Sequence, residues 1–161
     1  MLGVEMKNMS DFYNLLVQQA EALVDGVIYP IANYANLSAL LYQSLPEINW
    51  AGFYFIQDGK LVLGPFQGKP ACIEIEIGKG VCGTAVFRNE TIVVENVHEF
   101  PGHIACDGAS MSEIVIPLHR NGEIIGVLDI DSPVEGRFKE DDRLGLEKLV
   151  RMIEDKNKTR E

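Results

Sequence analysis

A hairpin signal in the second half of the chain constrains the fold more than any other feature. Two stretches of alternating apolar residues, 113–118 and 123–131, flank the pair Asn121-Gly122. Such a pair favours tight turns between antiparallel strands. Because side chains alternate across a strand, each stretch turns one face toward a core. The chain must therefore contain an antiparallel sheet with a core-facing side.

The register of this hairpin decides which residues share a face. A two-residue turn would pair Arg120 with Glu123 and would mix apolar and acidic residues on both faces. A type I turn followed by Gly122 as a bulge residue instead pairs His119 with Glu123, and we favour this register because it separates the faces. In this register Glu113 lies opposite Asp129. The two faces are Ile114, Ile116, Leu118, Ile124, Leu128 and Ile130 on one side, and Glu113, Asp129 and Asp131 on the other.

Three carboxylates thus gather on one predicted face beside the apolar residues Val115 and Val127. A solvated sheet face is the simplest interpretation, because charged residues are mostly exposed. The apolar neighbours weaken that interpretation and favour a pocket that contains acidic groups.

The rest of the chain adds helices and further strands. Helical spacing of apolar residues begins at Ser10, which we interpret as the N-cap, and again at Pro30 and near Glu140. The remaining predicted elements are strands at 50–56, 60–63, 72–77 and 91–95, a short helix at 80–88, and loops at 64–70 and 98–112. A length of 161 residues fits one compact domain, so we expect a single α+β domain over residues 1–161.

Charge and hydropathy exclude several classes of function. Asp and Glu number 24 against 14 Lys and Arg, and the net charge of -10 would repel nucleic acids and anionic lipid surfaces. Every apolar run stops short of the roughly 20 residues of a membrane span. The first ten residues lack the pattern of a signal peptide, so we expect a cytoplasmic protein.

Three cysteines, an odd number, point to a chemical or metal-binding role in a reducing compartment. Cys82 opens a predicted helix, where the dipole would stabilise a thiolate. Cys106 lies in the long loop near His103, and Cys72 opens a strand. On these local grounds Cys82 ranks slightly ahead of Cys106 as a nucleophile, and the order stays open.

Two further roles for the cysteines compete with a catalytic one. A free cysteine often only fills space in a core. Zinc binding with His98 or His103 is the second rival, but the chain has no C-x-x-C or H-x-x-x-H spacing, so we expect no metal site and no cofactor. We expect His98 to brace the loop, and His119 to be an exposed residue of the hairpin.

Four ordered motifs carry a family resemblance that extends from about the first helix to the last. They are Gly80-Val81-Cys82-Gly83-Thr84-Ala85, Gly102-His103-Ile104-Ala105-Cys106-Asp107, Ser112-Glu113-Ile114-Val115 and Gly126-Val127-Leu128-Asp129-Ile130-Asp131-Ser132. The chain resembles the free methionine-(R)-sulfoxide reductases, a family of single GAF domains. The resemblance implies a six-stranded antiparallel sheet with the N- and C-terminal helices on one face, a pocket on the other, and a homodimer.

The resemblance also implies roles for individual residues. It makes Cys106 the nucleophile, with Cys72 and Cys82 as the thiols that resolve its oxidised form and thioredoxin as the reductant. The residues implied in binding free methionine-(R)-sulfoxide are Trp50, Tyr54, Glu113, Asp129 and Asp131. Among the acids we assign Glu113 as the proton donor, because crowded carboxylates raise one another's pKa.

The main alternative function is a regulatory GAF module that binds a small ligand such as a cyclic nucleotide. Such modules usually sit beside an effector domain, for which we expect no room in this chain. A redox or metal sensor is a third candidate. The cysteines and the acidic face favour the reductase over both.

Overall fold

The computed structural model describes residues 8–103 and 108–158, so the predictions that concern Cys106 lie outside the described residues. The described part forms one six-stranded sheet, in which every pairing is antiparallel, in the order β3-β2-β1-β6-β5-β4. The strands are β1 (Trp50–Gln57), β2 (Lys60–Gly68), β3 (Glu74–Glu76), β4 (Ile92–Val94), β5 (Ser112–Arg120) and β6 (Glu123–Ser132). The α+β class and the strand number predicted for the chain are confirmed.

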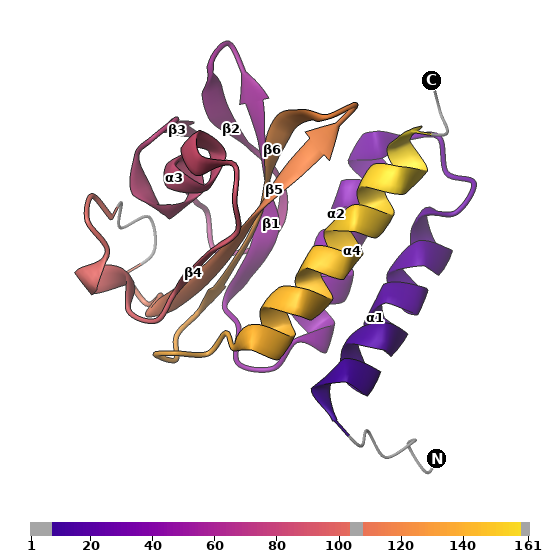
Figure 1. Ribbon diagram of the computed structural model, residues 1–161, viewed down its shortest axis with the longest axis horizontal. Helices are drawn as coiled ribbons and strands as arrows, with labels where there is room; N and C mark the ends of the chain where they lie inside the picture. The colour runs from indigo at the N-terminus through magenta and orange to yellow at the C-terminus, as the bar shows by residue number, and fades with distance from the viewer. Residues whose placement is uncertain (1–7, 104–107, 159–161) are drawn as a thin grey trace.

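Helices cover the two faces of the sheet unequally (Figure 1). The helices are α1 (Met9–Val24), α2 (Pro30–Ser44), α3 (Gly80–Arg88) and α4 (Glu140–Lys158), with the 3₁₀ helix η1 (Val97–Glu99) after β4. Helices α2 and α4 pack on one face, and α1 packs outside them against α4. Of these four helices, only the short α3 lies on the other face. No helix in the described ranges is long and apolar enough to cross a membrane.

Several element boundaries differ from the predictions for local reasons. The side chain of Asn8 accepts a hydrogen bond from Asp11 N at 2.9 Å, so Asn8 rather than Ser10 caps α1. Strand β2 continues to Gly68 through the predicted loop at 64–70, because a bulge in its pairing with β1 accommodates the extra length. Strands β3 and β4 are each shorter than predicted, three residues long.

The hairpin turn corrects the favoured register. It has two residues, and both Asn121 (φ 53°) and Gly122 (φ 80°) adopt left-handed conformations, as tight hairpin turns require. Arg120 therefore pairs with Glu123. The prediction that Gly122 acts as a bulge residue in a longer turn was wrong.

The bulge lies inside the strands instead, between Leu118 and His119, and shifts the pairs beyond it. Glu113 consequently lies opposite Asp131 and not opposite Asp129. The observed and predicted registers there differ by two residues, which preserves the alternation of faces. The prediction that these three acids share one face is therefore confirmed.

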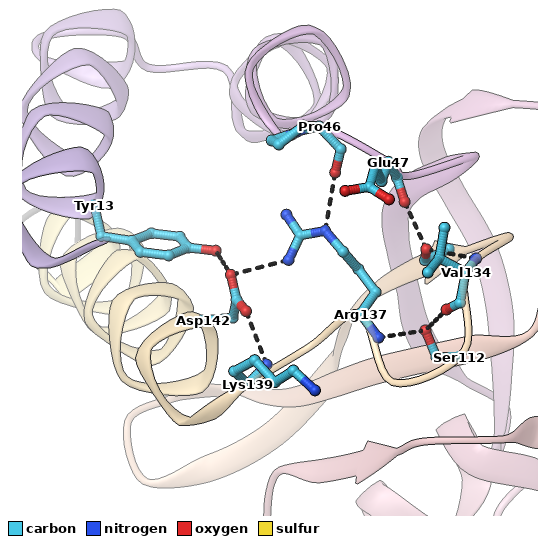
Figure 2. Close-up of polar contacts among 9 residues, drawn as sticks. Tyr13, Pro46, Glu47, Ser112, Val134, Arg137, Lys139 and Asp142 are labelled. Atoms are coloured by element: carbon cyan, nitrogen blue, oxygen red, sulfur yellow. Dashed lines mark hydrogen bonds and ion pairs between the residues drawn. The ribbon is translucent and has the colours of Figure 1, made fainter. Parts of the chain in front are cut away.

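A largely buried polar network connects the helical layer to the start of β5 (Figure 2). The Tyr13 hydroxyl donates to Asp142 Oδ1 at 2.6 Å, and Arg137 Nη1 contacts the same oxygen at 3.2 Å. Arg137 also donates through Nε to the Pro46 carbonyl at 3.0 Å, and through its backbone N to Ser112 Oγ at 3.3 Å. The network therefore connects α1, α4, the turn before β1 and the first residue of β5.

Replacing Asp142 by asparagine is expected to lower the free energy of unfolding by about 3 kcal/mol, because it leaves the buried Arg137 guanidinium without its counter-charge. Tyr13→Phe removes one hydrogen bond and is expected to cost about 1 kcal/mol. Urea unfolding measures both. Lys60→Gln, which breaks an exposed pair with Glu74, is the matched control; an Asp142→Asn variant no less stable than this control would contradict a stabilising network.

Candidate active site

The acidic face of the β5–β6 hairpin lies under α3 and forms one wall of a small cavity. Glu113 projects from β5 and Asp129 from β6, and their side chains are only 8% and 5% exposed. Asp131 lies directly opposite Glu113 in the sheet. The cavity has a volume of about 50 Å³, and its lining includes these three acids with Trp50, Tyr54, Cys82 and His103. The structure thus brings every described site residue of the prediction except Cys72 into one lining.

Burial controls the protonation of the acids. Burial raises the pKa of Glu113 well above its ordinary value, and the charges of Asp129 and Asp131 raise it further. The pKa of Asp129 is also raised by burial, although hydrogen bonds from Glu113, Asp131 and Cys82 oppose that rise. No ion pair among the described residues includes Glu113 or Asp129. Glu113 therefore keeps its proton to a higher pH than an ordinary glutamate.

Cys82 is a free thiol in the first turn of α3, and it is 4% exposed. Its Sγ lies 3.9 Å from Glu113 Oε2, as a weak hydrogen-bond donor. Burial raises the pKa of Cys82 well above the ordinary value, and the neighbouring Asp129 and Glu113 raise it further. Burial and these acids therefore oppose the expected effect of the helix start, which favours a thiolate.

Cys72 differs from Cys82 in both position and bonding. It is half-buried in the segment before β3, and it is disulfide-bonded. Its carbonyl accepts a hydrogen bond from the Tyr54 hydroxyl at 3.0 Å, which connects this segment to the cavity wall. Cys106 lies outside the described residues.

Aromatic rings form a second wall next to the acids. Trp50 and Tyr54 stack with their centroids 5.8 Å apart, and Trp50 stacks on Phe66 at 5.1 Å. Gly52 lies between the first two rings in β1, and a Cβ there would come within 2.3 Å of the Phe66 Cβ. Trp50 and Tyr54 thus line the cavity as predicted, and Phe66 supports Trp50 by stacking on its ring. Phe66 was not among the predicted residues, because 64–70 has the composition of a loop.

The three histidines have different environments. His103 lines the cavity, and burial together with the nearby His98 ring lowers its pKa, which favours a neutral ring. The prediction that His119 is exposed was wrong. It is half-buried, and its ring contacts Glu154 at 2.9 Å and Asn89 at 2.6 Å.

The cavity is much smaller than the roughly 300 Å³ of typical small-ligand pockets, and it has room for about one or two water molecules of ~30 Å³ each. Its wall includes loop residues from two segments, Pro70 and Ala71 before β3 and His103 after η1. An amino acid would therefore require this cavity to widen.

Comparison with known proteins gives a consistent assignment. The family model described as "GAF domain" matches residues 18–155. Free methionine-R-sulfoxide reductase of Escherichia coli is 56% identical, over 91% of this chain and 89% of the relative. The enzyme of the same name from Saccharomyces cerevisiae is 46% identical, over 91% of this chain and 86% of the relative.

A solved structure resembles the fold closely along the whole chain. Free methionine-R-sulfoxide reductase from Neisseria meningitidis, in complex with its substrate, superposes with a TM-score of 0.92 at 38% identity, covering 99% of this chain and 96% of that one. The chain therefore belongs to the GAF-domain family and, within it, to the free methionine-R-sulfoxide reductases.

Proposed function

We propose that the chain reduces free methionine-(R)-sulfoxide to methionine at this cavity through cysteine chemistry. The observation that carries the proposal is the pairing of two unlike walls. Buried Glu113 and Asp129 offer negative charge, and the stacked rings of Trp50 and Tyr54 offer an apolar surface. A free amino acid with a thioether-like side chain has the matching pair of groups, an ammonium and an apolar chain.

The acids have separate roles in this proposal. Asp129 and Asp131 hold the ammonium group of the substrate, and the buried Asp129 Oδ1 supports this because it accepts no hydrogen bond from the described residues. Glu113 keeps a proton near neutral pH and donates it to the sulfoxide oxygen. An anionic binding site for the amino group also explains a preference for the free amino acid over methionine within a peptide.

The sulfur chemistry begins at Cys106. Its thiolate attacks the sulfoxide sulfur while Glu113 protonates the oxygen, which gives an adduct with a bond between the two sulfur atoms. The hydroxyl then passes from the substrate sulfur to the sulfur of Cys106 as this sulfur–sulfur bond breaks, and Cys106 becomes a sulfenic acid. Methionine leaves with its sulfur reduced by two electrons. A second thiol then displaces water from the sulfenic acid and forms a disulfide.

The second thiol in this proposal is Cys72. Cys72 is disulfide-bonded while the buried Cys82 keeps a free thiol, and this difference supports Cys72 over Cys82 as the partner of the sulfenic acid. Thioredoxin then reduces the disulfide by thiol–disulfide exchange. Thioredoxin, the homodimer and the cytoplasmic location stay predictions from the family resemblance and the composition.

Turnover with the separate R and S sulfoxides of free methionine tests the proposal. With thioredoxin, its reductase and NADPH, we expect NADPH loss with the R form and at least about 100-fold slower loss with the S form, because the walls orient only one face of the sulfur. A blocked methionine-R-sulfoxide, acylated at nitrogen, should react poorly because it lacks the ammonium. Activity with neither free sulfoxide, under thioredoxin or a chemical reductant, would overturn the proposal; binding without turnover would favour a regulatory module.

A further inference from the structure

The cavity brings one thiol and two carboxylates close enough to share a metal ion. The Sγ of Cys82 and a carboxylate oxygen from each of Glu113 and Asp129 all lie within 4.8 Å of one another, and all three residues are buried. They come from α3, β5 and β6, so Cys82 lies well before the hairpin that carries the two acids. No short sequence spacing could therefore have indicated this group.

The spacing of these atoms suits a tetrahedral ion. Bonds of ~2.3 Å from zinc to sulfur and ~2.0 Å to oxygen place tetrahedral ligand atoms about 3.5 Å apart. The observed separation of Cys82 Sγ from Glu113 Oε2 is 3.9 Å, so small side-chain rotations bring the ligands into range. The cavity of about 50 Å³ has room for an ion and a water molecule of ~30 Å³ as a further ligand.

A second observation points to a cationic ligand. The Oδ1 atom of Asp129 is buried and has no hydrogen-bond partner among the described residues. A buried carboxylate oxygen without a donor carries a large desolvation cost, which a positive ligand removes. No ion pair of the described part of the chain neutralises Glu113 or Asp129.

We propose that Cys82, Glu113 and Asp129 form a binding site for zinc. The thiolate ligand selects zinc over magnesium and calcium, which prefer all-oxygen sites. Zinc binds the thiolate form of Cys82, so binding displaces the proton of that thiol. Asp131 and His103 also line the same cavity.

Zinc at this site inhibits the reductase. This consequence rests on the proposed function, whereas zinc binding itself does not. The ion occupies the Asp129 oxygen proposed to hold the substrate's ammonium, and it removes the proton that Glu113 donates. Inhibition is therefore competitive with the sulfoxide and is reversed by a chelator.

Cobalt(II) reports binding directly, because a thiolate ligand gives it a charge-transfer band in the near ultraviolet. In the full chain carrying Cys72→Ser and Cys106→Ser, Cys82 is the only cysteine. We expect this band with cobalt alone, and we expect added zinc to remove it. The further substitution Cys82→Ser should abolish the band, and Glu113→Gln or Asp129→Asn should weaken cobalt binding at least tenfold. Glu74→Gln, at an exposed acid, is the matched control and should change neither the band nor the affinity for cobalt.

Two results would contradict the proposed zinc site. One is the absence of the cobalt band in a folded protein carrying Cys72→Ser and Cys106→Ser, and the other is a band that persists after the further substitution Cys82→Ser. Thermal melts of each variant confirm folding, and Asp129→Asn provides a second test if Cys82→Ser does not fold. Steady-state turnover of the unmodified enzyme, with a phosphine reductant that does not chelate zinc as dithiols do, tests competition. Inhibition by zinc that excess sulfoxide does not relieve would contradict a site shared by zinc and substrate. A protein that shows the cobalt band but no turnover would contradict the proposed function and leave the zinc site unaffected.

Discussion

Replacing Cys106 by serine is expected to abolish the release of methionine, with a loss of at least about 10⁴-fold even in the first turnover. A serine hydroxyl is not ionised at neutral pH and cannot attack the sulfoxide sulfur. Cys82 cannot substitute for the lost thiolate, since burial and the neighbouring carboxylates raise its pKa. Mixing reduced enzyme with one equivalent of free methionine-(R)-sulfoxide and measuring methionine by chromatography tests this in the absence of any reductant.

The other two cysteine variants provide the matched controls. Cys72→Ser and Cys82→Ser should each still release one methionine per chain in that assay. In steady state with thioredoxin, Cys72→Ser should then stall, because no disulfide forms for thioredoxin to reduce, while Cys82→Ser should continue. Retention of the first turnover by Cys106→Ser would show that the nucleophile is assigned wrongly, and a stall in Cys82→Ser alone would move the resolving role to Cys82.

The acidic face could be predicted from the sequence, whereas the strand register could not. Alternation has a period of two, so any register shifted by an even number keeps Glu113, Asp129 and Asp131 together. The position of the bulge depends on the neighbouring strand. Gly126 follows the shifted pair, and a Cβ there would come within 2.2 Å of the Tyr54 carbonyl in β1. This close approach between β6 and β1 leaves no local signal in the hairpin sequence.

The state of Cys82 could not be predicted from its neighbours in the chain. The start of a helix favours a thiolate, and that effect is worth at most about 2 kcal/mol. Only folding buries this sulfur and brings the acids of β5 and β6 beside it, and burial together with these acids raises its pKa. The sequence around Cys82 correctly predicts the start of α3, but it contains no information on the burial and the neighbouring acids that set the pKa of the thiol. Phe66, which stacks on Trp50, was missed for a similar reason, because the bulge that keeps β2 paired with β1 depends on the contact between two strands.

Glu113→Gln is expected to lower kcat by about 10²–10⁴-fold, the usual contribution of a general acid. Glutamine keeps the size of the side chain and can still accept a hydrogen bond from Cys82, but it has no acidic proton for the departing oxygen. Single-turnover rates of methionine formation measure the loss. Glu123→Gln, at the exposed end of the same hairpin, is the matched control and should react at the normal rate.

The pH dependence distinguishes a proton donor from a residue that only shapes the cavity. The pKa of Glu113 is raised in the folded protein, so its protonated fraction, and with it the rate, should fall as pH rises through that pKa. The same proton stabilises the folded state at low pH, and this stability is lost as pH rises. Glu113→Gln should therefore lose the descending limb of the rate profile, and its melting temperature relative to the unmodified protein should increase from pH 5 to pH 8. A descending limb that persists in Glu113→Gln would instead assign the proton to Asp129, whose pKa is also raised by burial.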